Sequence, residues 1–143
     1  MLKGMAVLVV EDDPLMRILL RRKFQRCGAG CVLECETGEE ALDRLIRFGG
    51  LIDVVVSEWN LPGMSGLELI ERVRQLEPEL PLLLVTKRAD ERSVTAAIGA
   101  GVSGYVMKPF SPDALVRRLR CIAAASNANT HVLRCVPQGG KAA

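Results

Sequence analysis

Acidic side chains follow two strand-length apolar runs of the chain. Glu11, Asp12 and Asp13 directly follow the first run, and Glu58 follows a later run after one serine. Adjacent carboxylates repel one another unless a cation or a lysine lies among them. A hard divalent cation such as Mg²⁺ takes oxygen ligands and is usually held by one or two carboxylates. The acids therefore predict a cation or phosphoryl site, although Asp13 alone is explained by a helix cap.

Two other apolar runs end in groups that suit an anion. Thr86 follows Leu82–Val85, and its hydroxyl can donate a hydrogen bond to a phosphoryl oxygen. Lys108 follows Tyr105–Met107 and supplies an ammonium group. Taken singly, a threonine here is commonly solvated and a lysine is often a salt-bridge partner. The carboxyl ends of parallel strands meet at one edge of a sheet, where ligands bind, so the four strand ends together predict a site.

The elements that position these residues alternate regularly. Strands are predicted at 6–10, 31–35, 54–56, 82–85 and 105–107, and helices at 14–26, 38–47, 66–76, 90–100 and 112–124. Short apolar strands separated by helices are typical of βαβ units. The sequence therefore predicts an α/β fold, a doubly wound parallel sheet with helices on both faces. The segment 31–35 is less apolar and contains Glu34, which favours an edge strand.

The predicted helix starts carry capping side chains. Asp13 and Ser111 each precede a proline, and Thr37 and Ser65 each precede a glutamate by three residues, as in a capping box. The run Gly99–Gly104 spells GxGxxG, the dinucleotide fingerprint. It ends a predicted helix instead of opening one, so it is interpreted as a helix C-cap and turn.

Length and composition predict one globular domain. The chain has 143 residues, of which 49% are hydrophobic and 25% charged, with a net charge of +2. This balance does not favour nucleic acid as the main partner, and residues 125–143 are too few to form a DNA-binding domain. We expect a domain over 1–124 and a flexible tail or linker over 125–143. The sequence contains no long apolar stretch of the kind that inserts into a membrane. The expected location is the cytoplasm, where the five cysteines would be reduced.

The order and intervals of the site residues resemble the receiver domain of bacterial two-component response regulators over about residues 5 to 124. The resemblance rests on the segments 8–13, 57–66 and 104–110 and on Thr86. It implies the flavodoxin-like strand order 2-1-3-4-5. It also implies a Mg²⁺ site formed by Glu11, Asp12, Glu58 and the backbone carbonyl of Asn60, and a cis peptide bond from Lys108 to Pro109. Glu58 would stand at the phospho-acceptor position, Lys108 would be its phosphoryl or carboxylate partner, and Thr86 and Tyr105 would form the switch pair.

The family has aspartate where this chain has Glu58. A glutamate carries its oxygens about one methylene further out, and a shift on the order of 1 Å can cost roughly 10²-fold in rate. Little or no self-phosphorylation is therefore expected. Two interpretations stay open: Glu58 imitates the phosphorylated acid, or it pairs with Lys108 and locks one conformation. Lys87 also departs from the small residue that the family usually has there, and it either crowds the phosphoryl donor or is simply solvated.

The resemblance implies a signalling module and not an enzyme. Its expected partners are a histidine kinase, a phosphotransfer protein or a downstream effector, bound through the face of the fourth helix, fifth strand and fifth helix. That face could also form a homodimer, and neither DNA nor membrane is an expected partner. One alternative is a conventional Mg²⁺-dependent phospho-accepting regulator, with Glu58 either competent or an engineered replacement of aspartate. A Mg²⁺-dependent phosphatase is disfavoured, because the pattern D-x-D-x-T does not follow the first strand.

Overall fold

The computed structural model describes residues 2–87 and 90–135, within which five strands alternate with five α-helices. The strands are β1 (Ala6–Val10), β2 (Cys31–Cys35), β3 (Val54–Glu58), β4 (Leu82–Thr86) and β5 (Gly104–Met107). The helices are α1 (Pro14–Arg26), α2 (Gly38–Phe48), α3 (Gly66–Leu76), α4 (Glu91–Ala100) and α5 (Pro112–Cys135), with a short 3₁₀ helix η1 (Gly49–Leu51) before β3.

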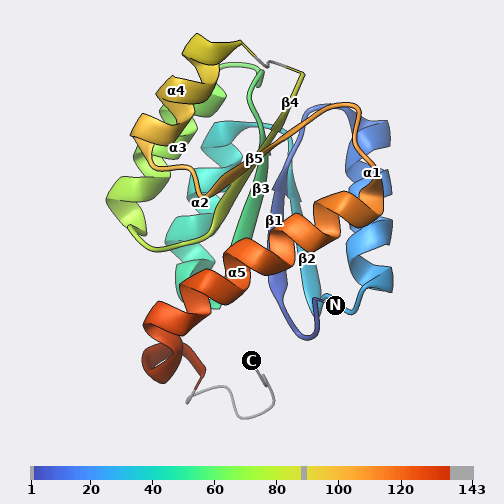
Figure 1. The fold of residues 1–143 in the computed structure, drawn as a ribbon, viewed down its shortest axis with the longest axis vertical. Helices are drawn as coiled ribbons and strands as arrows, with labels where there is room; N and C mark the ends of the chain where they lie inside the picture. The colour runs from blue at the N-terminus through green and yellow to red at the C-terminus, as the bar shows by residue number, and fades with distance from the viewer. Residues whose placement is uncertain (1, 88–89, 136–143) are drawn as a thin grey trace.

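The strands form one parallel sheet in the order β2-β1-β3-β4-β5, with helices on both faces (Figure 1). This confirms the predicted doubly wound α/β fold with strand order 2-1-3-4-5, and it confirms β2 as an edge strand. In the part of the chain that the structure describes, no helix is both long and apolar enough to cross a membrane.

Alternate residues of the central strands pack into two separate cores. Leu8 of β1 packs with residues of α2, α3 and α4, whereas Val7 packs with residues of α1 and α5. Such runs are apolar at every position because both faces of a parallel sheet are covered by helices. The side chains of β3 and β4 are buried throughout, including those of Glu58 and Thr86 at their last positions.

The predicted helix caps are present. The side chains of four residues accept hydrogen bonds of 2.9 to 3.1 Å from first-turn backbone N–H groups: Asp13, Thr37, Ser65 and Ser111. Gly101 ends α4 in the left-handed conformation, with φ of 105°. The structure therefore agrees with the interpretation of the glycine-rich run as a C-cap and turn.

Some element ends differ from the prediction. Strands β3 and β4 continue through Glu58 and Thr86, because Glu58 pairs with Val85 and Thr86 pairs with Met107. The predicted end of the last helix at Ala124 was wrong, since α5 runs to Cys135. No glycine or proline interrupts residues 125–135, so the helix has no local reason to end earlier. Residues 136–143 lie outside the described residues, and the predicted domain boundary at 124 stays a prediction.

Candidate functional site

The ends of three strands bring Glu11, Glu58 and Lys108 together at the carboxyl edge of the sheet. The ammonium Nζ of Lys108 lies 2.9 Å from Oε1 of Glu11 and 2.7 Å from Oε1 of Glu58. The side chain of Lys108 is 11% exposed, that of Glu11 is 4% exposed and that of Glu58 is 9% exposed. The lysine therefore bridges two buried carboxylates, one directly after β1 and one at the end of β3.

The second oxygen of each carboxylate accepts hydrogen bonds from the backbone. Oε2 of Glu58 accepts from the N–H of Trp59 and, at 3.3 Å, from that of Asn60. Oε2 of Glu11 accepts from the N–H of Asp13 at 3.2 Å. All four carboxylate oxygens of Glu11 and Glu58 thus have an N–H donor. The Glu58 side chain curls back over the loop that follows it instead of extending away from the strand.

The loop after β3 is held in place by a close approach to the start of α3. The N–H of Gly66 donates to the carbonyl of Trp59 at 2.8 Å. A Cβ at Gly66 would lie 2.6 Å from the Cα of Trp59, so only glycine fits at this contact. Gly63 adopts φ of 74°, which favours glycine within the same loop. These contacts fix the two amides that face Glu58.

Burial and the shared ammonium act on the pKa values of the site in opposite ways. Burial raises the pKa of Glu11 above its ordinary value, and the hydrogen bonds from Lys108 and the Asp13 amide offset only part of this rise. Burial alone would lower the pKa of Lys108, but its hydrogen bonds to Glu58 and Glu11 outweigh that effect and raise it. Lys108 is therefore held as a cation between the two acids.

The remaining predicted site residues lie around this group. Thr86 is buried at the end of β4, and its carbonyl accepts from the N–H of Lys108 at 2.8 Å. The peptide bond from Lys108 to Pro109 is cis, as expected. Tyr105 is half-buried and packs against the core under α3 and α4. Asp12 is exposed.

Lys87 is also exposed, as its solvated interpretation requires. Among the described residues it makes no hydrogen bond or ion pair with Glu58, whose side-chain partners are Lys108 and the backbone amides of Trp59 and Asn60. A direct effect of Lys87 on the Glu58 carboxylate is therefore not part of this arrangement.

The residues expected to bind Mg²⁺ are not arranged as a metal site. Within residues 2–87 and 90–135, no three His, Cys, Asp or Glu side chains gather to hold a metal ion. Each oxygen of Glu11 and Glu58 already accepts from an N–H group, and Lys108 supplies the positive charge. In this arrangement the ammonium group of Lys108, and not a metal ion, lies between the two carboxylates.

Sequence reasoning missed two contributors to the site. The amides of Trp59 and Asn60 carry no signal in the sequence, because every residue except proline has such a donor. The second contributor is Arg17, whose guanidinium donates to the carbonyl of Glu11 at 2.8 Å and pairs with Glu34 at 3.5 Å. The only signal in the sequence for this contact was the position of an arginine on the first helical turn after the acid cluster.

The sheet order and the acid and lysine groups at its carboxyl edge are those of a CheY-like receiver fold. A sequence model of the response regulator receiver domain matches residues 7–120. The chain belongs to this family.

Relatives and solved structures agree. The chain is 38% identical over 117 residues to a chemotaxis protein CheY homolog of Campylobacter jejuni, covering 80% of this chain and 89% of that protein. It is 35% identical over 120 residues to the chemotaxis protein CheY1 of Helicobacter pylori, covering 82% and 96%. A crystal structure of a putative response regulator from Chloroflexus aurantiacus superimposes with a TM-score of 0.78 at 35% identity, covering 85% of this chain and 99% of that one.

Membership of the family carries its general properties. Receiver domains and CheY homologues are modules of two-component signal transduction, not classical enzymes, and they interact with kinases and downstream effectors. Receiver domains generally bind Mg²⁺ at their acidic pocket.

Proposed function

We propose that this chain is a receiver module in which Glu58 occupies the phospho-acceptor position, and that it signals by protein contact without being phosphorylated. The observation that carries the proposal is that both oxygens of the Glu58 carboxylate accept hydrogen bonds from the chain itself. Oε1 accepts from Lys108 at 2.7 Å and Oε2 accepts from two backbone amides. Hydrogen bonds to both oxygens draw negative charge from the carboxylate and turn Oε2 back onto its own loop, so Glu58 is a weaker nucleophile toward a phosphoryl donor.

The geometry favours a fixed conformation over imitation of a phosphoryl group. A carboxylate has one charge and two oxygens, whereas a phosphoryl group has about two charges and three acceptor oxygens. Here one of the two oxygens faces the chain's own amides. Glu58 with Lys108 therefore acts as an internal ion pair that holds one state of the site. A protein partner, and not a phosphoryl group, then reads this state.

Mg²⁺ at Glu11, Asp12, Glu58 and the Asn60 carbonyl belongs to the same proposal as a weak, competing ligand. A metal ion that took the two carboxylates from Lys108 would leave a buried ammonium group without a partner. That group would then have to lose its proton or move, which costs free energy. Receiver chemistry relies on positioning and on neutralising charge around the transferring phosphoryl group. With the ammonium already committed, the site does not need a metal ion to be stable.

The partner face proposed for this module is formed by α4, β5 and α5. Ile98 on α4 and Met107 on β5 are 64% and 45% exposed, so this face offers two large apolar side chains to a partner. Tyr105, the proposed switch aromatic, lies on β5 beside them. Thr86 pairs in register with Met107, so the end of β4 is directly linked to this face. The same surface suits a kinase, a phosphotransfer protein, an effector or a second copy of the chain.

Intact mass measured after incubation with Mg²⁺ and acetyl phosphate tests the proposal. The wild-type protein is expected to keep its mass, whereas Glu58→Asp is expected to gain one phosphoryl group. The variant is a matched control, because it keeps the charge, Lys108 and Glu11. Ready phosphorylation of the wild-type protein on Glu58 would refute the proposal.

A conventional phospho-accepting regulator is the second candidate. The contacts of Lys108 with Glu11 and with the backbone of Thr86 support it, because an acid, a lysine and a hydroxyl at one site suit phosphoryl transfer. Phosphorylation of the wild-type protein at a rate close to that of Glu58→Asp would select it.

A further inference from the structure

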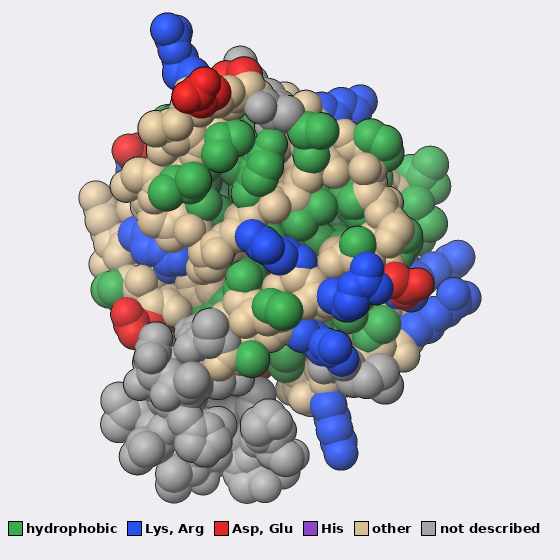
Figure 2. Space-filling model, in the orientation of Figure 1, with side chains coloured by type: hydrophobic (Ala, Val, Ile, Leu, Met, Phe, Trp, Pro, Cys, Tyr) green, Lys and Arg blue, Asp and Glu red, His purple; other side chains and the backbone are tan. Residues whose placement is uncertain are grey.

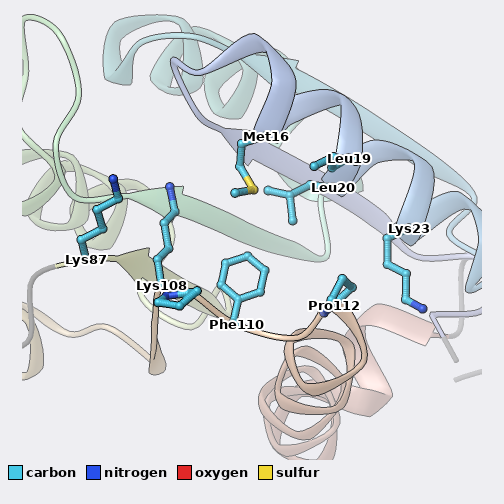
Figure 3. Close-up of a pocket in the computed structure, with 9 residues that line it drawn as sticks. Met16, Leu19, Leu20, Lys23, Lys87, Lys108, Phe110 and Pro112 are labelled. Atoms are coloured by element: carbon cyan, nitrogen blue, oxygen red, sulfur yellow. The ribbon is translucent and has the colours of Figure 1, made fainter.

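A pocket of about 310 Å³ lies beside the acid site, between α1 and the loop that joins β5 to α5 (Figure 3). Its walls are apolar and are formed by Met16, Leu19, Leu20, Pro109, Phe110 and Pro112. Figure 3 shows Phe110 facing Met16 and Leu20 across the pocket, with Lys87 and Lys108 at one end and Lys23 at the other. In Figure 2, hydrophobic side chains gather on this face of the molecule with basic side chains beside them.

The charges around the pocket identify the chemistry that it would accept. Lys23 is paired with Asp113 at 2.6 Å, and Lys108 is paired with Glu11 and Glu58. Lys87 makes no ion pair within the part of the chain that the structure describes, and it is exposed at the pocket's edge. The pocket therefore combines apolar walls with one lysine, Lys87, that has no ion-pair partner among the described residues. A ligand with an apolar body and one acidic group matches both features.

The size of the pocket also limits its occupant. Small-molecule sites typically begin at about 300 Å³, whereas an α-helix with its side chains is about 10–12 Å across. A cavity of about 310 Å³ can enclose a small molecule but only one or two side chains of a helix. Leu20, at the base of the pocket, is 4% exposed, so the pocket reaches the core instead of being a shallow surface feature.

The pocket shares one side chain with the acid site. The stem of Lys108 lines the pocket, while its ammonium group bridges Glu11 and Glu58. A ligand packed against this stem would act on the position of the ammonium group. Phe110 follows the cis peptide bond at Pro109 and lines the same wall. The pocket and the Glu58 carboxylate are thus joined through the side chain of Lys108.

We propose that this pocket is a regulatory site for a small apolar monocarboxylate, which binds against Phe110 and Lys87 and changes the Lys108 bridge. The regulatory part rests on the proposed function, because a module that is not phosphorylated needs another input. Binding of the ligand to the pocket does not depend on the proposed function. The two are measured separately, since ligand binding is read by NMR and phosphorylation is read by intact mass.

The test is a titration of the ¹⁵N-labelled full chain with 4-phenylbutanoate, 2-naphthoate and decanoate, and with the primary amide of each acid. At least one acid is expected to give saturable shifts of the Leu19 and Phe110 amides, with a dissociation constant below about 1 mM. The amides of Trp59 and Asn60 are expected to shift in the same titration, because they donate to Glu58.

Three variants assign the contacts. Lys87→Gln is expected to weaken binding of the acid roughly tenfold and to leave binding of its amide unchanged, because only the acid uses the ammonium. Leu19→Ser is expected to weaken both ligands. Leu15→Ser is the matched control, because Leu15 is 67% exposed on the same helix but does not line the pocket. It is expected to bind both ligands as the wild type does.

Three results would overturn the proposal. Absence of saturable shifts at Leu19 and Phe110 with all three acids would remove the site. An equal loss of affinity in Leu15→Ser and Leu19→Ser would instead make this face a broad docking surface for a partner protein. Saturation of the pocket without movement of the Trp59 and Asn60 amides would refute the regulatory link.

Discussion

At the scale of single residues, the acid site is organised around Lys108 as its cation. Its ammonium group holds Glu11 and Glu58, and the backbone supplies the other donors. The convergence of these three side chains could be predicted from strand ends, because parallel strands end at one edge. The way in which the Glu58 carboxylate turns back could not, since backbone donors occur at every position and the side-chain rotamer depends on the loop.

Replacing the cation of Lys108 should remove a contribution to stability that depends on pH. A cation whose pKa is higher in the folded than in the unfolded protein adds stability that is complete below the unfolded value and is lost as pH rises through the folded value. The pKa of Lys108 is raised above its ordinary value of 10.5. Lys108→Met should therefore lower the free energy of unfolding at pH 7 to 9, and the difference from wild type should shrink as pH rises beyond 10.5.

Urea unfolding of both proteins from pH 7 to pH 11 measures this difference. The loss at neutral pH should be about 3–5 kcal/mol, the usual cost of leaving a buried charge without its partner. Lys87→Met serves as the control, because Lys87 is exposed and makes no ion pair with any described residue. A difference that stays constant across this pH range would show that the ion pair is not what stabilises the site.

The same bridge predicts weak binding of Mg²⁺. Wild-type Trp59 fluorescence should not respond to millimolar Mg²⁺, because Lys108 occupies the carboxylates. Lys108→Met should respond at concentrations at least tenfold lower, since two buried acids then lack a cation. If the wild type responded at the lower concentration as well, the ammonium group would not exclude the metal.

At the scale of elements, the start of α3 shapes the loop that carries the Glu58 donors. Ser65 caps the helix, and Gly66 lies directly against Trp59. Caps and turns of this kind are local, so the helix starts could be predicted from short motifs. The contact between Gly66 and Trp59 could not be predicted, because it depends on how the loop is packed. The helix end at Cys135 was not predicted, because the composition of the tail resembles a linker. The tail nevertheless contains no residue before Pro137 that stops a helix.

A methyl group at Gly66 should disturb this loop. Its Cβ would lie 2.6 Å from the Cα and 2.7 Å from the carbonyl oxygen of Trp59, which are backbone atoms that cannot move alone. Gly66→Ala should therefore cost about 1–3 kcal/mol of unfolding free energy. It should also shift the amide resonances of Trp59 and Asn60 while α3 remains helical.

Gly99→Ala is the matched control, because Gly99 lies inside α4 and a Cβ there would meet nothing within 4 Å. This variant should be more stable than the wild type by roughly 0.5–1 kcal/mol. Equal stability of the two variants, measured by chemical denaturation, would contradict the role assigned to Gly66.

At the scale of the whole molecule, two cores on either side of one sheet support a single site at its carboxyl edge. The alternation of strands and helices was sufficient to predict this arrangement, because βαβ crossovers have a fixed hand. The pocket between α1 and the loop after β5 was not predicted, since its residues are far apart in the sequence and apolar residues carry no specific signal. The tertiary structure alone brings Met16 and Phe110 together.

Truncation after Ala124 tests the predicted domain boundary. The predicted domain ends at residue 124, and the composition of residues 125–143 predicts a tail or linker. Removing residues 125–143 should therefore change the free energy of unfolding by less than about 1 kcal/mol, measured by urea denaturation. A loss of more than about 2 kcal/mol would place the domain boundary beyond 124.

The central claim is that the Glu58 carboxylate is held by Lys108 and by its own loop, so that the site needs neither metal nor phosphoryl group. The most direct measurement follows the ¹H and ¹⁵N resonances of the Trp59 and Asn60 amides while Mg²⁺ and acetyl phosphate are added. Both resonances should stay in place in the wild-type protein and move in Glu58→Asp. Movement of both resonances in the wild-type protein, to the same extent as in Glu58→Asp, would contradict the claim.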